Sequence, residues 1–144
     1  MKQIYILLIA LLMGLSANAE ESGTCGPNLK WHLTDDGVLT ISGKGEMDDY
    51  RFSPWSTSDV KRIIIGNRVT TIGQAAFSGC RSLTSVTIPN SVTTIGQGAF
   101  SDCRSLTSVT IPNSVTTIGL HAFYGCSSLT SVTIPNSVTT IGLH

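Results

Sequence analysis

The chain has 144 residues, of which 41% are hydrophobic and only 12% are charged, and its 9 Lys and Arg residues balance 9 Asp and Glu residues. This length corresponds to a single domain. Zero net charge without clustered Lys and Arg excludes a dedicated nucleic-acid-binding protein and argues against a protein held on membranes by charge.

The first nineteen residues have the pattern of a secretory signal peptide. Lys2 precedes an apolar stretch over residues 4–15, and Ala17-Asn18-Ala19 resembles a cleavage site. The alternative, a transmembrane anchor, needs about 20 apolar residues. A lipidated Cys25 is disfavoured because no Leu stands three residues before it. We therefore expect an exported protein, secreted or at the cell surface, without a membrane span after signal removal.

Residues 20–62 are predicted to form an amino-terminal capping region. Apolar residues alternate with polar ones over 29–33, Asp36-Gly37 is a turn signal, and 38–41 is a second strand candidate. This pattern predicts a β-hairpin that covers the apolar end of the segment beginning at residue 63. The segment 43–62 is predicted to be an irregular linker.

An internal repeat of 23 residues occupies 63–144. The units are 63–85, 86–108, 109–131 and the partial unit 132–144; the first pair agrees at 17 of 23 positions and the second pair at 18 of 23. A period in this range with apolar residues at constant places predicts a solenoid, because one unit cannot bury its own apolar side.

Within a unit, the apolar spacing predicts the path of the chain. Residues 86–88 alternate as a short strand, which Pro89 ends. Gly96 is expected to adopt a turn conformation closed to other residues. The apolar spacing over 99–106 predicts a short helical or 3₁₀ return. The fold class is therefore an α/β-type solenoid of short parallel strands, with an amino-terminal β-hairpin cap.

The string Leu83-Thr84-Ser85-Val86-Thr87-Ile88-Pro89-Asn90, continued through Gly96 to Cys103, resembles the BspA-like (treponemal-type, 23-residue) leucine-rich repeats of bacterial surface proteins. The resemblance recurs through 63–144, and residues 25–55 are similar to a region often joined to such repeats. It implies a leucine-rich-repeat solenoid on an exported or surface protein that binds other proteins or cells, including host matrix in some members. It does not imply a particular ligand.

Four cysteines in an exported chain suggest disulfides. Cys80, Cys103 and Cys126 share one repeat position, and neighbouring turns would hold them about 4.8 Å apart, within the disulfide range. Their parallel side chains nevertheless favour free buried thiols, with Cys25 left single. No metal site is predicted, because the chain has no C-x-x-C pair.

No catalytic residue and no cofactor is predicted. His121 and Cys126 lie five residues apart, but Cys126 belongs to the core column, where a buried thiol is inert. The pairs Asp35-Asp36 and Asp48-Asp49 lack the ligand spacing of a calcium loop, and no Gly-x-Ser-x-Gly motif is present.

Two surfaces are candidates for ligand binding. On the strand side, hydroxyl side chains are expected to point outward in two nearly uncharged columns: Ser85, Thr87, Ser108, Thr110, Ser131 and Thr133. The second candidate is an aromatic and apolar patch at variable repeat positions: Leu120, His121 and Tyr124. The alternative for the strand side is a solvated surface without a ligand.

These features predict an exported, non-catalytic, adhesin-like interaction module that binds a protein or glycan ligand, such as host matrix. The alternative is the targeting arm or a fragment of an exported degradative enzyme acting on polysaccharide or peptide. Ice or mineral binding is disfavoured because outward Ser and Thr are mixed. The repeats stop before the fourth turn closes, so we expect no carboxyl-terminal cap, truncation from a longer protein, and self-association or fraying at that end.

Overall fold

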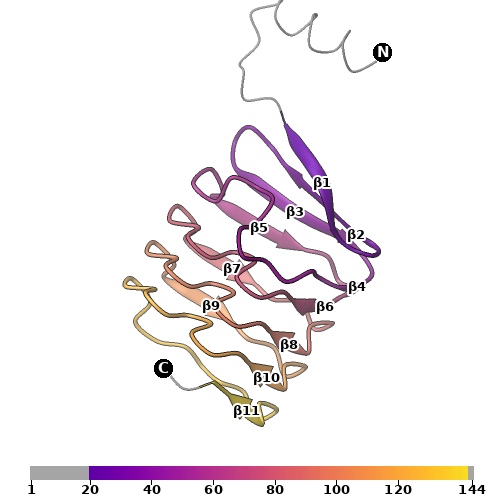
Figure 1. Cartoon of the computed structure of the whole chain (residues 1–144). Coiled ribbons are helices and arrows are strands. Elements are labelled where there is room, and N and C mark those ends of the chain that lie inside the picture. The colour runs from indigo at the N-terminus through magenta and orange to yellow at the C-terminus, as the bar shows by residue number, and fades with distance from the viewer. Residues whose placement is uncertain (1–19, 143–144) are drawn as a thin grey trace, which may run out of the picture.

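The computed structural model describes residues 20–142, which form a β-solenoid of about five turns. Two sheets run along opposite sides of the stack (Figure 1). One extends from the amino-terminal strands to residues 108–110, and the other extends from residues 45–46 to residues 140–141 in the last turn. The predicted signal peptide lies outside the described residues. The solenoid arises because each turn buries its apolar residues against the turns before and after it.

Sheet A combines the amino-terminal strands with the first strand of each regular turn. Its order is β1-β2-β3-β5-β7-β9. The strands are β1 (Glu21–Gly26), β2 (Leu29–Leu33), β3 (Val38–Gly43), β5 (Arg62–Ile65), β7 (Ser85–Thr87) and β9 (Ser108–Thr110). The strands β1, β2 and β3 pair antiparallel, whereas β3, β5, β7 and β9 pair parallel.

The hairpin expected over residues 29–41 is present, with Leu33 opposite Leu39 and Leu29 opposite Gly43. Its turn uses Gly37 at a φ of 90°, in the region that favours glycine. Strand β1 was not predicted, and it lies outside β2 at the edge of the sheet. The amino-terminal layer is therefore three antiparallel strands wide.

Sheet B lies on the other side of the stack, and its strands are very short. Its order is β11-β10-β8-β6-β4, and all of its pairs are parallel. The strands are β4 (Gly45–Glu46), β6 (Val69–Ile72), β8 (Thr94–Ile95), β10 (Thr117–Ile118) and β11 (Thr140–Ile141). These strands correspond to the second apolar segment of each repeat.

The returns between the sheets are not helical, so this part of the predicted fold class is wrong for the described residues. In the turn 86–108, the amides of Ala99, Ser101 and Cys103 donate to carbonyls three residues earlier in the same turn. The intervening amides donate instead to the next turn, as Phe100 does to the carbonyl of Ala122 at 2.8 Å. A 3₁₀ helix needs consecutive hydrogen bonds within the segment. It cannot form here because every second amide donates to a carbonyl of the next turn.

Left-handed backbone occurs at two repeat positions within each return. One position has φ values of 52°, 61° and 58° at Ala75, Gly98 and His121. The other has φ values of 77°, 57° and 73° at Gly79, Asp102 and Gly125. The two left-handed residues of each return lie four positions apart, so they interrupt the run of negative φ values that a helix requires. The variable residues of the repeat thus include both left-handed sites.

Gly96 is required for a reason other than the one predicted from the sequence. It does not belong to the residues with positive φ. A Cβ atom at Gly96 would lie 2.7 Å from the backbone nitrogen of Gln74 in the preceding turn. Glycine is therefore needed here for close approach between turns and not for turn conformation.

The predicted linker over 43–62 is in fact the return half of an additional turn. Strand β3 pairs in parallel with β5, with Leu39 opposite Ile63, and β4 pairs with β6. The Leu39–Ile63 spacing is 24 residues, whereas Trp55 stacks on Phe77 only 22 residues later. These offsets differ from 23 in both directions, so a constant period does not detect this turn.

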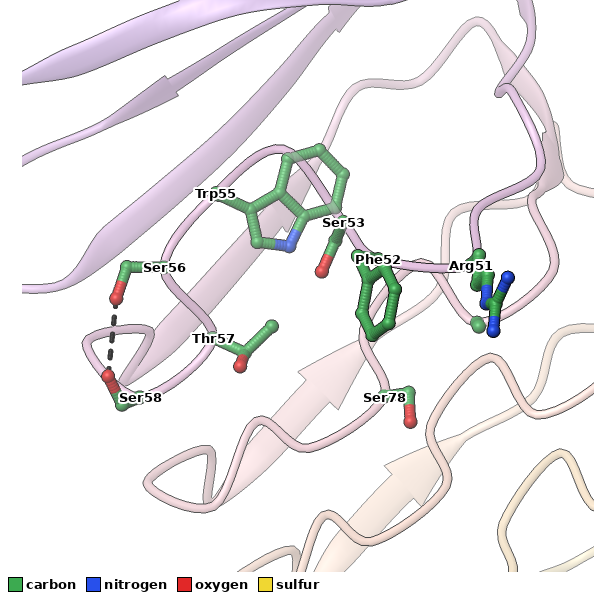
Figure 2. A pocket seen from close by; sticks show the side chains of 9 residues that line it. Arg51, Phe52, Ser53, Trp55, Ser56, Thr57, Ser58 and Ser78 are labelled. Atoms are coloured by element: carbon green, nitrogen blue, oxygen red, sulfur yellow. Dashed lines mark hydrogen bonds between the residues drawn. The ribbon is translucent and has the colours of Figure 1, made fainter.

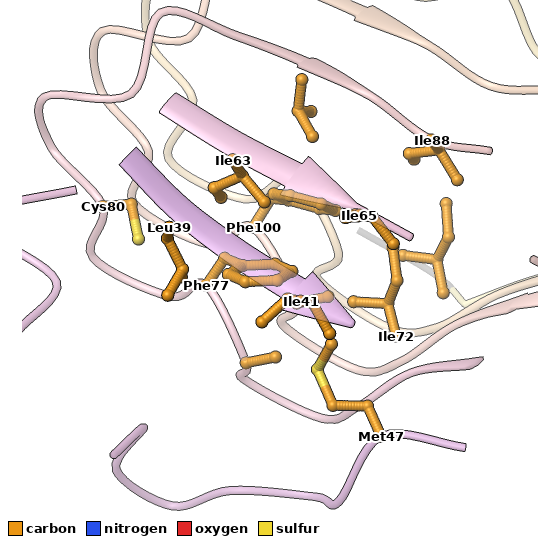
Figure 3. Close-up of a cluster of buried hydrophobic side chains, with 14 of the residues drawn as sticks. Leu39, Ile41, Met47, Ile63, Ile65, Ile72, Phe77, Cys80, Ile88 and Phe100 are labelled. Atoms are coloured by element: carbon orange, nitrogen blue, oxygen red, sulfur yellow. The ribbon is translucent and has the colours of Figure 1, made fainter. Parts of the chain in front are cut away.

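The buried core extends from Cys25 to Cys126, and Figure 3 shows part of it. Its centre is a column of stacked rings in which Trp55, Phe77, Phe100 and Phe123 have successive centroid distances of 5.5, 5.4 and 5.5 Å. Trp31 adds an edge contact to Trp55 at 5.8 Å. Burying each such ring contributes about 2–3 kcal/mol, so this column is a main source of stability.

Candidate functional site

The outer face of sheet A carries the hydroxyl columns predicted from the sequence. Ser85 lies beside Ser108 and Thr87 beside Thr110 in the parallel register, and all four side chains are exposed. Ser131 and Thr133 are also exposed, but they lie outside the strands of the sheet. The structure therefore aligns the columns within β7 and β9, and the next turn continues them in irregular backbone.

Two residues that sequence reasoning missed extend this face toward the amino terminus. Ile64 lies between Thr40 and Thr87 in the sheet register, and 42% of its surface is exposed. Arg62 is exposed and lines a shallow depression together with Ile64, Ser85 and Thr87. The face is therefore less uniform than predicted, because it has one apolar and one cationic side chain among the hydroxyls.

The exposure of Ile64 could have been predicted from strand alternation, but the local sequence obscures that alternation. Residues 63–65 form a continuous apolar run, Ile63-Ile64-Ile65. Alternation along a strand puts only the first and third of these side chains in the core, at 5% and 8% exposure. A continuous run conceals that alternation, and the pairing of Ile64 with Thr87 reveals it. We refer to the outer face formed by Thr40, Arg62, Ile64, Ser85, Thr87, Ser108 and Thr110 as the strand face.

The second predicted patch lies on the return side of the turn 109–131. The rings of His121 and Tyr124 are 5.2 Å apart, and Tyr124 is 60% exposed. Leu120 and His121 are half-buried. The structure thus brings the two aromatic residues together, while Leu120 offers a smaller exposed surface than the sequence suggested.

Tyr124 also borders an open apolar depression at the last turns. Its apolar walls include Ile118, Phe123, Ile134 and Ile141. Ile134 and Ile141 are 41% and 56% exposed. The structure does not show what covers this surface, and the self-association expected there stays a prediction.

The cysteines are free and buried, which confirms the preferred interpretation of the sequence. The thiol of Cys103 donates to the carbonyl of Phe77 at 3.2 Å, and that of Cys126 donates to the carbonyl of Phe100 at 3.1 Å. Hydrogen bonding with Cys103, followed by burial, raises the pKa of Cys126. A protonated thiol in the core is a poor nucleophile, so the spacing of Cys126 from His121 carries no catalytic meaning.

One member of each acidic pair, Asp36 and Asp49, accepts a hydrogen bond within the fold. Asp49 accepts a hydrogen bond from the backbone amide of Gln74 at 2.7 Å, which links the additional turn to the next one. Asp36 accepts a short hydrogen bond from the hydroxyl of Thr34 within the hairpin turn. Across residues 20–142, no group of three or more His, Cys, Asp or Glu side chains could hold a metal ion.

The amino-terminal end contains the most perturbed ionisable pair outside the cysteine column. Burial, with a smaller contribution from the negative charge of Asp48, raises the pKa of Cys25 to about 11. Burial, followed by Cys25 and Asp48, raises the pKa of Tyr50 to about 12. Both groups are neutral at physiological pH and contribute packing, not charge.

The described part of the chain, residues 20–142, contains no helix with the length and apolar character that crossing a bilayer requires.

Comparisons with a family model and with solved structures both relate this chain to leucine-rich repeat proteins. Residues 46–144 match six copies of the BspA type leucine rich repeat region. A search among curated proteins found no significant match. The fold resembles a leucine-rich repeat protein from Eubacterium ventriosum, with 35% identity, a TM-score of 0.71, and coverage of 85% of this chain and 40% of that one.

Two other solved structures are also similar. The leucine rich repeat protein of T. pallidum has 27% identity and a TM-score of 0.65, with coverage of 83% of this chain and 64% of that one. A leucine-rich repeat protein from Bacteroides ovatus has 27% identity and a TM-score of 0.58, with coverage of 81% of this chain and 36% of that one. The chain thus spans less than two thirds of the length of these proteins.

Proposed function

The chain belongs to the BspA-type leucine-rich repeat family, and on that basis we propose that it is an exported, non-catalytic, adhesin-like module that binds a protein through its strand face. Solenoids present extended surfaces of this kind for binding. Export is supported by the signal-like sequence of residues 1–19. The bacterial repeat proteins of similar structure support the interaction role.

One observation carries this proposal: the exposed isoleucine in the centre of the strand face. Ile64 is 42% exposed and lies in register between two hydroxyl residues, with Arg62 on the same strand. An apolar side chain surrounded by hydroxyl groups resembles the core and polar rim of a protein interface. Arginine is also enriched at such interfaces because its planar group makes several hydrogen bonds.

The regular backbone beneath this face favours binding for an entropic reason. The strand residues are held by parallel pairing on both sides in β5 and β7. A partner therefore meets side chains whose backbone is already ordered, and association loses less conformational freedom. The hydroxyl groups of Ser and Thr can donate and accept, so they match varied partner groups.

Binding of the chain to immobilised extracellular-matrix proteins tests the proposal, with a glycan array as a second arm. We expect saturable binding to a protein. A variant with Thr87→Lys, Thr110→Lys and Thr133→Lys should bind at least tenfold more weakly, because three bulky charges would cover the face. The matched control carries Gln74→Lys, Gln97→Lys and Ser127→Lys, which adds the same charge at exposed return positions.

Equal loss of binding in both variants would contradict the strand face and indicate a general effect of charge. Binding to glycans alone would overturn the protein partner. The variant Ile64→Ser adds a test without any change of charge, and the proposal requires that it also weaken binding.

A further inference from the structure

The additional turn forms a pocket on the return side, away from the strand face (Figure 2). Its loop, residues 51–58, departs from the regular return and leaves a cavity of about 460 Å³ against the following turn. The cavity is within the range of roughly 300–1,000 Å³ that is typical of small-molecule sites. We call it the loop pocket. It is lined by Arg51, Phe52, Ser53, Trp55, Ser56, Thr57, Ser58, Ala75 and Ser78.

Hydroxyl groups dominate the polar lining of the loop pocket. They belong to Ser53, Ser56, Thr57, Ser58 and Ser78. Ser56 and Ser58 are 3.2 Å apart and hydrogen-bond to each other at one side (Figure 2). Each hydroxyl can donate and accept, which suits a ligand that itself carries several hydroxyl groups.

One aromatic and one cationic side chain stand at the mouth of the pocket. Phe52 is 82% exposed, an unusual position for a phenylalanine in a chain with a well-packed core. The guanidinium carbon of Arg51 lies 5.7 Å from the centre of this ring. Arg51 is the only ionisable side chain among the lining residues, so the pocket has a positive charge and no carboxylate.

Trp55 gives the pocket an unused hydrogen-bond donor. Its side chain is only 3% exposed, and its indole nitrogen is buried without a hydrogen-bond partner. The nitrogen lies on the edge of the ring that faces Ser53 and Thr57 (Figure 2). A buried donor without a partner costs about 1–3 kcal/mol. Rotation of one of these hydroxyl side chains would admit a ligand oxygen that satisfies it.

We propose that the loop pocket binds a carboxylated sugar residue. The apolar face of a sugar ring packs on the exposed ring of Phe52, and its hydroxyl groups exchange hydrogen bonds with the serine and threonine side chains. The carboxylate pairs with Arg51, whose planar group binds carboxylates through two parallel hydrogen bonds. This site does not depend on the strand face, because it lies on the return between β4 and β5 and shares no residue with that face.

Titration of the ¹⁵N-labelled full chain with D-glucuronate, followed by NMR, tests this proposal. The chain has two tryptophans, so the indole signal of Trp55 can be followed directly. We expect that signal to shift with a saturable dependence on glucuronate. The uncharged analogue D-glucose should bind at least tenfold more weakly, because it lacks the carboxylate that Arg51 recognises.

Two variants locate the site. Arg51→Gln should weaken glucuronate binding at least tenfold, and Phe52→Ser should weaken it severalfold, while both keep the folded spectrum because these side chains are exposed. The control Arg81→Gln removes an exposed arginine outside the pocket and should leave binding unchanged. No saturable shift, equal binding of glucose, or unchanged binding by Arg51→Gln would each overturn the proposal.

The result of the glucuronate titration can be distinguished from the result of the matrix-binding test of the strand face. The variant with Thr87→Lys, Thr110→Lys and Thr133→Lys should bind glucuronate as the unmodified chain does. Failure of matrix binding together with intact glucuronate binding would therefore reject only the proposed function.

Discussion

Residues 132–142 repeat the sequence of residues 109–119, yet residues at the same repeat position differ in burial between this last turn and the turns before it. Ile88 and Ile111 are 3% and 8% exposed, whereas Ile134 is 41% exposed. Ile95 and Ile118 are 0% and 4% exposed, whereas Ile141 is 56% exposed. At the amino-terminal end, the additional turn and β1–β3 cover the first regular turn, and Ile72 is fully buried. Burial in a solenoid is therefore a property of the neighbouring turns.

The strongest test of this comparison removes the same ring from two places in the aromatic column. Phe100 is fully buried between Phe77 and Phe123, so Phe100→Ala should lower the free energy of unfolding by about 4 kcal/mol. Phe123 is only half-buried, and Phe123→Ala should cost about 1–2 kcal/mol. Urea unfolding followed by circular dichroism measures both. Equal losses would mean that burial in the structure does not determine the contribution of each turn.

A second comparison separates close approach from backbone conformation at two glycines of one turn. Gly96→Ala places a Cβ atom 2.7 Å from the backbone of the preceding turn, and it should cost about 2–3 kcal/mol because two turns must separate. Gly98→Ala meets nothing closer than 3.9 Å but keeps a φ of 61°, so it should cost about 1 kcal/mol. The same urea measurement compares them. A larger loss at Gly98 would contradict the interturn contact.

Two ionisable groups at the amino-terminal end, Cys25 and Tyr50, should make the free energy of unfolding depend on pH. The pKa of Cys25 is raised from 9.0 to about 11 and that of Tyr50 from 10.0 to about 12. The folded state thus holds these protons more tightly than the unfolded state, which favours unfolding as both groups ionise. The contribution of these two groups to stability should be fully present below pH 9, decline from about pH 9 upward and be lost through pH 11–12. Urea midpoints between pH 8 and 12 measure this decline.

The variant Cys25→Ala provides the control for that measurement. Its overall stability falls because it removes a buried side chain, but its decline between pH 9 and 11 should be shallower than that of the unmodified chain. An unchanged pH dependence would show that the ionisation of Cys25 does not contribute.

The smallest expected effect concerns the left-handed positions of the returns. Ala75 has a φ of 52°, which is costly for a residue with a Cβ atom, so Ala75→Gly should raise stability by about 0.5–1 kcal/mol. The neighbouring Ala76 lies outside the residues with positive φ and is fully buried. Ala76→Gly should therefore lower stability by about 1 kcal/mol. Opposite signs in thermal unfolding would confirm the left-handed site, and losses in both variants would reject it.

Several features of the fold could be predicted because they are properties of the repeat. The spacing of Val86 and Ile88 indicates a short strand, and the register pairs Val86 with Val109. The hydroxyl groups of Thr87 and Thr110 follow as the outward partners of those residues. The shared position of Cys103 and Cys126 likewise indicated stacked buried thiols.

Other features depend on contacts between turns, and local spacing does not report them. The apolar positions over 99–106 have helical spacing, but interturn hydrogen bonds convert that segment into alternating turns. In the turn 38–62, the spacing to the equivalent residue of the next turn is 24 residues in the strand and 22 residues in the return. This turn therefore lacks the constant period of its neighbours. The loop pocket and the exposed Ile64 both belong to this irregular region or lie next to it.

The sequence by itself determined the period, the first strand of each repeat, the apolar columns and the family, because all four depend on which residue types recur at constant spacing. Only the tertiary structure decided which of those apolar residues are buried, which backbone positions are left-handed, and where the return leaves a pocket. The physical reason is that a solenoid turn has no core of its own. Its hydrogen bonds and its exclusion of water are completed by the turns on either side.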